Sequence, residues 1–207
     1  MKTFSKQEPV VICCYGDSNT RYFYGDTQED GPACESYPVQ LQELFRARGF
    51  DNVTVLHCGY PDMMSDFALA QYPANITEQN SNICIYGFGT NDINKEDADL
   101  EEYLDNTARV FDQFQKQGVA GLSLLMPWFD LEYAGKEGQD RLPGWNSMLA
   151  QLCMVKNVMV LDTYTPFQAD PARFFNEKLT PRRHYSKDAC RVIAEMAFAA
   201  IAPMITE

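Results

Sequence analysis

Histidine is scarce in this chain, which has only His57 and His184 among its 207 residues. The seven cysteines include no C-x-x-C pair. Metal sites usually gather several histidine or cysteine ligands at short spacings, so the sequence predicts no metal site. No glycine-rich phosphate loop follows the first apolar run, which disfavours a nucleotide cofactor. We therefore expect a protein without a cofactor.

Positive charge is also in short supply. Lys and Arg number 17 against 29 Asp and Glu, which gives a formal net charge of -12. A surface this acidic repels phosphate backbones and anionic lipid heads. We therefore expect neither nucleic acid nor a membrane surface as a partner. The charge indicates neither a substrate nor an oligomeric state.

Long apolar runs are missing as well. No run approaches the ~18 residues needed to span a bilayer, and the start "MKTFSKQEPVV" lacks the apolar segment of a secretory signal. Cys13, Cys14, Cys58 and Cys84 lie inside short apolar runs. Buried free thiols in a reducing compartment explain these cysteines most simply, so we expect a cytoplasmic protein.

The apolar residues are gathered into short runs rich in Val, Ile and Leu. These runs barely alternate with polar residues, as is typical of parallel strands buried on both faces. The expected strands are 10–16, 53–59, 82–89, 122–128 and 158–164. Helical periodicity occurs at 39–48, 99–117, 144–156 and 187–202. The alternation predicts a single α/β domain over 1–207, with a doubly wound parallel five-stranded sheet between two layers of helices.

The acidic stretch 92–105, "DINKEDADLEEYLD", could suggest a calcium loop. An EF-hand loop starting at Asp92 would need glycine at Asp97 and glutamate at Tyr103, so the spacing fails. We expect instead a solvent-exposed helix N-terminus, where carboxylates face the positive end of the helix dipole. Gly118 is expected to end the helix at 99–117.

The segment "VVICCYGDSNT" (10–20) places Asp17 and Ser18 directly after an expected strand. Both residue types commonly cap helices, because their oxygens accept free backbone N–H groups. Ser18 could therefore be a turn residue or a nucleophile. In a doubly wound sheet, ligands bind beyond the carboxyl ends of the strands, which is where Ser18 falls.

Other groups suited to acyl transfer follow the other strands. Gly59 ends the second expected strand and can present a bare backbone N–H. Asn91 follows the third strand and carries an amide donor. His184, in a late loop, can act as a base near neutral pH. Acyl transfer needs a nucleophile, a base and donors for the oxyanion, and together these residues could supply all three.

The sequence resembles the SGNH hydrolase superfamily, also called GDSL-type esterases or lipases. "YGDSNT" is similar to the first family block, "HCG" to the second, "GTND" to the third and "HYSKDACRVIAEMA" to the last. The resemblance implies Ser18 as nucleophile, Gly59 and Asn91 as oxyanion donors, and His184 as base. It further implies a flavodoxin-like three-layer α/β/α fold and a small-molecule ester substrate, with carbohydrate or small-ester deacylation as one possibility.

The last block departs from the family pattern. The family usually carries Asp three residues before the catalytic histidine, a position held here by Pro181. Either Ser18 and His184 work as a dyad, or another carboxylate, such as Glu177, reaches His184. The alternative is a non-catalytic binding domain that kept the fold and lost the acid.

Side chains around these blocks are candidates for supporting roles. His57, two residues before Gly59, is expected to orient the oxyanion loop. Tyr22, Tyr24 and Trp128 are candidates for lining the substrate pocket, with ordinary core or loop positions as the alternative.

Overall fold

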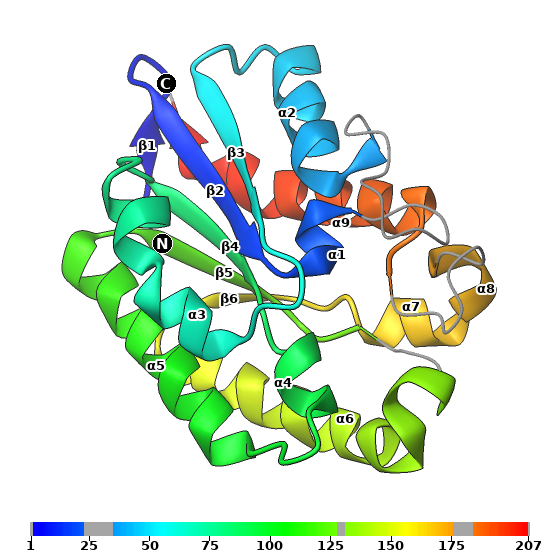
Figure 1. Ribbon diagram of the computed structural model, residues 1–207. Coiled ribbons are helices and arrows are strands. Elements are labelled where there is room, and N and C mark those ends of the chain that lie inside the picture. Colours follow the sequence, from blue (N-terminus) through cyan, green and yellow to red (C-terminus); the bar gives the residue numbers. More distant parts are fainter. Residues whose placement is uncertain (1, 23–34, 128–130, 176–183, 207) are drawn as a thin grey trace.

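The computed structural model describes residues 2–22, 35–127, 131–175 and 184–206. Its centre is a sheet of five parallel strands in the order β3-β2-β4-β5-β6 (Figure 1). The strands are β2 (Val10–Gly16), β3 (Val53–Gly59), β4 (Ile83–Gly87), β5 (Ala120–Leu124) and β6 (Met159–Leu161). This order and the helices on both faces confirm the expected doubly wound, three-layer α/β/α fold.

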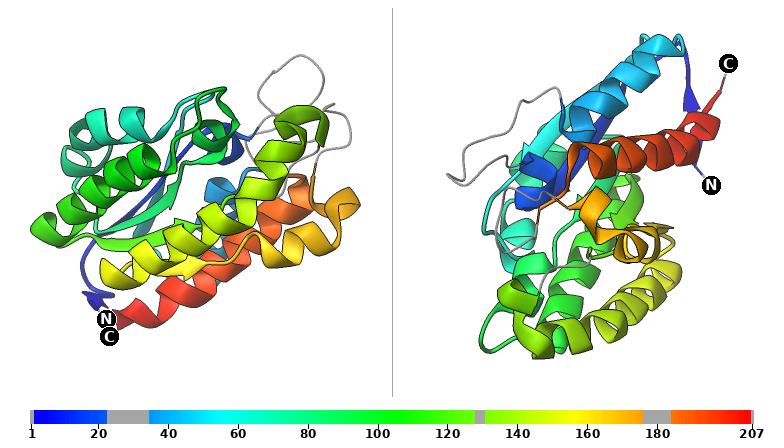
Figure 2. Two further views of the ribbon diagram at one scale, coloured as in Figure 1. Left: turned by 90° about the horizontal axis from the view of Figure 1, so that it is seen from below. Right: turned by 90° about the vertical axis from the view of Figure 1, so that its right-hand side faces the viewer.

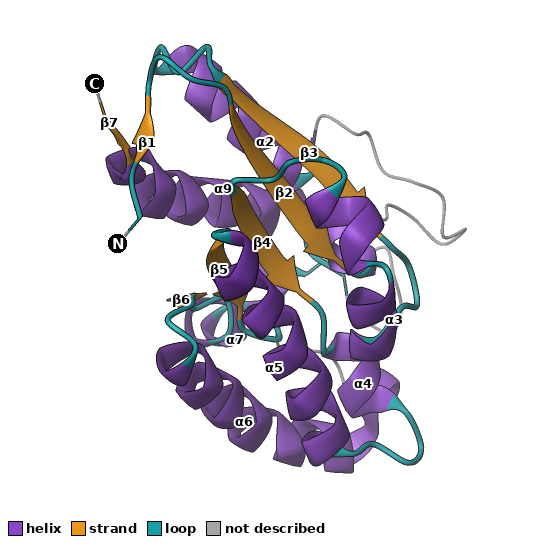
Figure 3. Cartoon of the chain, turned by 90° about the vertical axis from the view of Figure 1, so that its left-hand side faces the viewer, coloured by secondary structure: helices purple, strands orange, loops and turns teal. Residues whose placement is uncertain are grey.

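Helices cover the sheet on both faces (Figure 3). The longer ones are α2 (Tyr37–Ala47), α5 (Leu100–Gln117), α6 (Leu131–Val155) and α9 (Lys187–Ile201). The shorter ones are α1 (Ser18–Arg21), α3 (Ser65–Ala70), η2 (Pro73–Thr77), α4 (Thr90–Asn94), α7 (Thr165–Ala169), α8 (Pro171–Phe174) and η3 (Ala202–Met204). Helices α2 and α9 pack on one face of the sheet, and α3, α5 and α6 pack on the other.

Strand β2 shows why both faces are apolar. Successive side chains of a strand point to opposite faces. Ile12 and Cys14 pack against the α2 and α9 side, whereas Cys13 and Tyr15 pack against the α3 and α5 side. All four are fully buried, so both faces of β2 are covered and both carry apolar side chains.

The expected bounds agree with the structure to within about two residues in the first half of the chain and for the helix at 187–202, and less well for the other elements of the second half. The expected strand 122–128 is wrong at both ends, because β5 begins at Ala120 and ends at Leu124. Strand β6 is shorter than 158–164, because it pairs with β5 over three residues only. Helix α6 begins well before 144, with Gly135 (φ 62°) interrupting its helical backbone. The expected helix end at Gly118 is confirmed, since its φ of 68° is left-handed.

The two ends of the chain lie side by side (Figure 2). Strands β1 (Phe4–Ser5) and β7 (Ile205–Thr206) pair in a small parallel sheet. Within the described ranges, no helix is long and apolar enough to cross a membrane.

Candidate active site

Ser18 is the first residue of α1, directly beyond the carboxyl end of β2. Asp17 is the N-cap, and its Oδ1 accepts a 2.8 Å hydrogen bond from the backbone N–H of Asn19. Capping is thus carried out by Asp17, and the Ser18 hydroxyl makes a different contact. Ser18 Oγ lies 2.9 Å from Nε2 of His184. A hydroxyl and an imidazole at this distance can pass a proton between them.

His184 reaches Ser18 from 166 residues away in the sequence. The residues that follow it are fixed by their own contacts. The Tyr185 N–H donates to Oδ1 of Asn19 at 3.2 Å, which joins the histidine segment to α1. The ring of Tyr185 is buried, and the Ser186 hydroxyl accepts from the N–H of Ala189 to cap α9. Asn19 was missed as a supporting residue by the sequence analysis, although it lies inside the "GDSNT" block.

Gly59 ends β3 beside Gly16 of β2. A Cβ at this position would lie 2.6 Å from Cα of Arg21 and 2.8 Å from the carbonyl carbon of Thr20. A side chain there would therefore collide with the backbone of α1. Glycine lets α1 approach the end of β3, which brings residue 59 next to the segment that carries Ser18.

Asn91 lies in α4, beyond the end of β4. The helix follows Gly89, whose φ of 128° favours glycine. Nδ2 of Asn91 donates a 2.9 Å hydrogen bond to the carbonyl of Met63. An amide nitrogen carries two hydrogens, so this bond fixes the amide plane and leaves the other hydrogen for a ligand.

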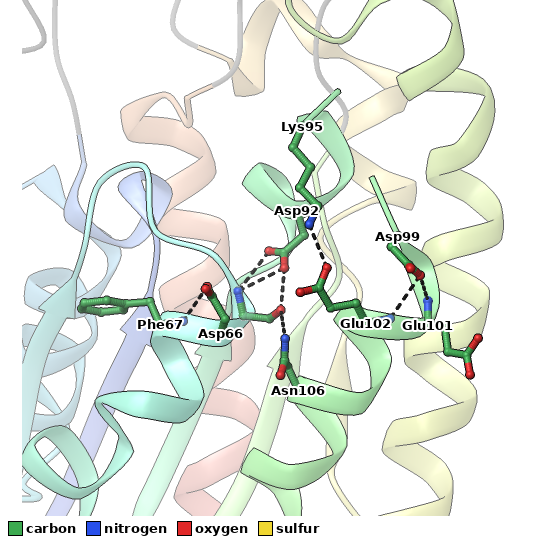
Figure 4. Close-up of polar contacts among 9 residues, drawn as sticks. Asp66, Phe67, Asp92, Lys95, Asp99, Glu101, Glu102 and Asn106 are labelled. Atoms are coloured by element: carbon green, nitrogen blue, oxygen red, sulfur yellow. Dashed lines mark hydrogen bonds and ion pairs between the residues drawn. The ribbon is translucent and has the colours of Figure 1, made fainter. Parts of the chain in front are cut away.

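Asp92 corrects the expectation of a solvent-exposed acidic stretch. It is only 5% exposed, and its Oδ1 and Oδ2 accept from the Ser65 N–H at 3.1 and 3.2 Å. The Ser65 hydroxyl also donates to Oδ1 at 2.5 Å (Figure 4). Burial raises the pKa of Asp92, while these hydrogen bonds lower it. The exposed N-terminus starts later, where Asp99 caps α5 by accepting from the N–H groups of Glu101 and Glu102.

Asp17 is a fully buried carboxyl beside the proposed nucleophile. Burial raises its pKa to about 7, although the N–H of Asn19 and the nearby Thr90 hydroxyl act in the opposite direction. The charge on Asp92 raises it further. Asp17 therefore changes charge near neutral pH, in the same range as an ordinary histidine.

The remaining expected site residues are placed as follows. Nε2 of His57 donates to the carbonyl of Thr20 at 2.7 Å, which joins the end of β3 to α1. Tyr22 is 3% exposed and its hydroxyl donates to Glu35, which places its ring in the core rather than in an open pocket. Tyr24, Trp128, Glu177 and Pro181 lie outside the described residues.

A cavity of about 460 Å³ lies at the opposite edge of the sheet, near the starts of β5 and β6. Its two lysines are already engaged, because Lys156 pairs with Asp112 and Lys2 donates to the carbonyl of Gly118. Its described lining contains no histidine or serine.

Across the described ranges, no group of three His, Cys, Asp or Glu side chains could hold a metal ion.

The chain matches the model of the GDSL-like lipase/acylhydrolase family over residues 14–191. It therefore belongs to this family and is an ester-hydrolysing enzyme. The expected superfamily is thereby confirmed. A comparison with curated proteins gives no match.

Solved structures share the fold at low sequence identity. A lipase/acylhydrolase from Enterococcus faecalis is 17% identical with a TM-score of 0.81, covering 95% of this chain and 97% of that one. A catalytic mutant of Axe2, an acetylxylan esterase from Geobacillus stearothermophilus, is 14% identical with a TM-score of 0.75 and 99% coverage of both chains. The aryl esterase of M. smegmatis is 13% identical with a TM-score of 0.76, covering 95% of this chain and 100% of that one.

Proposed function

We propose that the protein hydrolyses small carboxylic esters, including acylated carbohydrates, through an acyl-enzyme formed on Ser18. The observation that carries the proposal is the 2.9 Å contact between Ser18 Oγ and His184 Nε2. A serine hydroxyl is a weak nucleophile until a neighbouring base removes its proton. The similarity to an acetylxylan esterase and an aryl esterase supports small esters as the substrate class.

In this mechanism Ser18 Oγ attacks the acyl carbon while His184 Nε2 takes the hydroxyl proton. Negative charge then develops on the former carbonyl oxygen. The N–H groups of Ser18 and Gly59 and the free hydrogen of the Asn91 amide stabilise it. His184 next gives its proton to the leaving alcohol, and the bond between that alcohol and the acyl carbon breaks. Water, deprotonated by His184, then attacks the acyl carbon of the acyl-enzyme. The bond between that carbon and Ser18 Oγ breaks, His184 returns the proton to Oγ, and the acid is released.

We propose further that Ser18 and His184 act as a dyad. Pro181 occupies the position of the usual family acid and has no carboxylate. Glu177 is seven residues from His184, and Pro181 between them restricts how the chain can turn back.

The six described cysteines are free thiols, which supports a reducing compartment such as the cytoplasm for this enzyme.

Initial rates on p-nitrophenyl esters of increasing acyl length, measured beside acetylated sugars, test the proposal. We expect turnover of short esters by the wild type. Ser18→Ala should lower kcat by about 10⁶, because the nucleophile is lost. Circular dichroism of both proteins controls for folding. Activity of Ser18→Ala within tenfold of the wild type would refute the assignment, and a folded wild type without any turnover would favour the non-catalytic binding domain.

A further inference from the structure

The direction of the Asn91 amide depends on a loop that belongs to another part of the chain. Its nitrogen donates to the carbonyl of Met63, in the segment between β3 and α3. If this carbonyl moves, the amide plane turns with it, and the hydrogen left for an oxyanion turns too. The direction of the proposed oxyanion donor therefore depends on the position of the Met63 carbonyl.

The Met63 segment is held weakly by its own contacts. The Met63 N–H lies 3.4 Å from the carbonyl of Tyr60, a long hydrogen bond. Asp62 adopts a left-handed backbone with φ 59°, which non-glycine residues adopt infrequently. Met63 is 36% exposed. A firmer anchor lies two residues further on.

Ser65 supplies that anchor, at the first residue of α3. Both its N–H and its hydroxyl donate to the Asp92 carboxylate, at 2.5 to 3.2 Å (Figure 4). Nδ2 of Asn106 on α5 donates to the Ser65 hydroxyl at 3.3 Å. Ser65 is 1% exposed and Asp92 5%, so little water competes for these bonds. Two consecutive residues of α4, Asn91 and Asp92, thus hold the same short loop.

We propose that Asp92 is a positioning residue that fixes the direction of the Asn91 amide by anchoring the Met63–Ser65 segment to α4. The inference rests on the proposed role of Asn91 as an oxyanion donor. A purely structural role would be to cap α3, because Met64 at the N-cap makes no side-chain cap bond. The two roles differ in one respect: capping acts on stability alone, whereas positioning acts through Asn91.

A double-mutant cycle separates these roles. Asp92→Ala should lower kcat by about 10- to 100-fold with KM within threefold, a part of the roughly 10²–10³ that one oxyanion donor contributes. In the Asn91→Ala background, the same change should cost less than about threefold, because the group it positions is gone. Asp66→Ala is the matched control, since Asp66 is an exposed acid on α3, next to Ser65, that bonds only to the neighbouring Phe67 N–H in the contacts described. Equal losses in both backgrounds would overturn the proposal.

Two further measurements keep the test independent of folding and of activity. If Asp92→Ala does not fold, Ser65→Ala removes the 2.5 Å bond to Asp92 and the 3.3 Å bond from Asn106 but keeps the bonds from the Ser65 N–H. It should show the same non-additivity with a smaller loss. In ¹⁵N–¹H spectra, the side-chain amide signals of Asn91 are the pair missing from Asn91→Ala. They should shift in Asp92→Ala, or in Ser65→Ala if that variant is used, and stay in place in Asp66→Ala. Unshifted signals in the folded variant would overturn the proposal, and they can be measured even in an inactive protein. Inactivity of the wild type would count separately, against the proposed function.

Discussion

The two sides of the proposed site are held by different kinds of contact. The oxyanion side, residues 59–65 and 89–92, consists of the segments that follow β3 and β4 and lead into α3 and α4. Several hydrogen bonds join one segment to the other. The base side, residues 184–186, comes from the far end of the chain and meets α1 through the His184–Ser18 and Tyr185–Asn19 contacts. The sheet topology therefore positions the proposed oxyanion donors, whereas long-range contacts position the proposed base.

Among the substitutions that distinguish the two sides, we expect the largest loss of kcat from one on the oxyanion side. Asn91→Ala should lower kcat by roughly 10²–10³ and change KM little, because the donor matters most when charge builds on the oxygen. Steady-state kinetics on one short ester measures both constants. A change confined to KM would mean instead that Asn91 binds the substrate in its ground state.

Asp17 lies where the two sides meet, and its titration should make stability depend on pH. Its folded pKa of about 7 exceeds the ordinary value of 3.8, so the folded state binds the proton more tightly. The stabilising contribution is complete below the unfolded pKa and is lost as pH rises through the folded one. Between pH 5 and pH 8 this loss amounts to about 3 kcal/mol of unfolding free energy.

Denaturant unfolding of the wild type and Asp17→Asn at both pH values checks this. The variant keeps an oxygen for the Asn19 N–H but cannot ionise, so its unfolding free energy should fall less between pH 5 and pH 8. Groups elsewhere titrate in both proteins and cancel in the comparison. Parallel curves for the two proteins would show that Asp17 does not titrate in this range.

The base side should respond more mildly to the loss of a single support. Asn19→Ala removes the acceptor for the Tyr185 N–H, one hydrogen bond worth about 1 kcal/mol. We expect kcat to fall about tenfold, with His184 still within reach of Ser18. The pH dependence of kcat/KM and thermal unfolding serve as controls. A loss as large as that of Asn91→Ala would erase the contrast between the two sides.

The smallest expected effect concerns the missing acid. Glu177→Gln should change kcat less than threefold if Ser18 and His184 form a dyad. A triad acid stabilises the imidazolium, and replacing one by an amide costs on the order of 10⁴ in kcat. A loss beyond about a hundredfold in a protein with unchanged circular dichroism would make Glu177 the third member of the site.

The sequence predicted the positions of Gly59 and Asn91 because Gly59 ends one short apolar run and Asn91 follows another, and parallel strands bring their carboxyl ends to one edge. It could not predict the partner of Asp92 by spacing, since Ser65 lies 27 residues earlier on a helix too short to show periodicity. The contact of Asn19 with Tyr185 spans 166 residues and depends on how α9 packs. Helices α3 and α4 are likewise too short to show helical periodicity, so the sequence did not predict them.

Labelling with a fluorophosphonate probe tests the central claim most directly, because the reagent reacts with an activated serine. Intact mass and peptide mapping of the folded protein should show one adduct, located on Ser18. The adduct should be absent from Ser18→Ala and form much more slowly in His184→Ala. A folded wild type that takes up no probe, or an adduct on a different residue, would contradict the account.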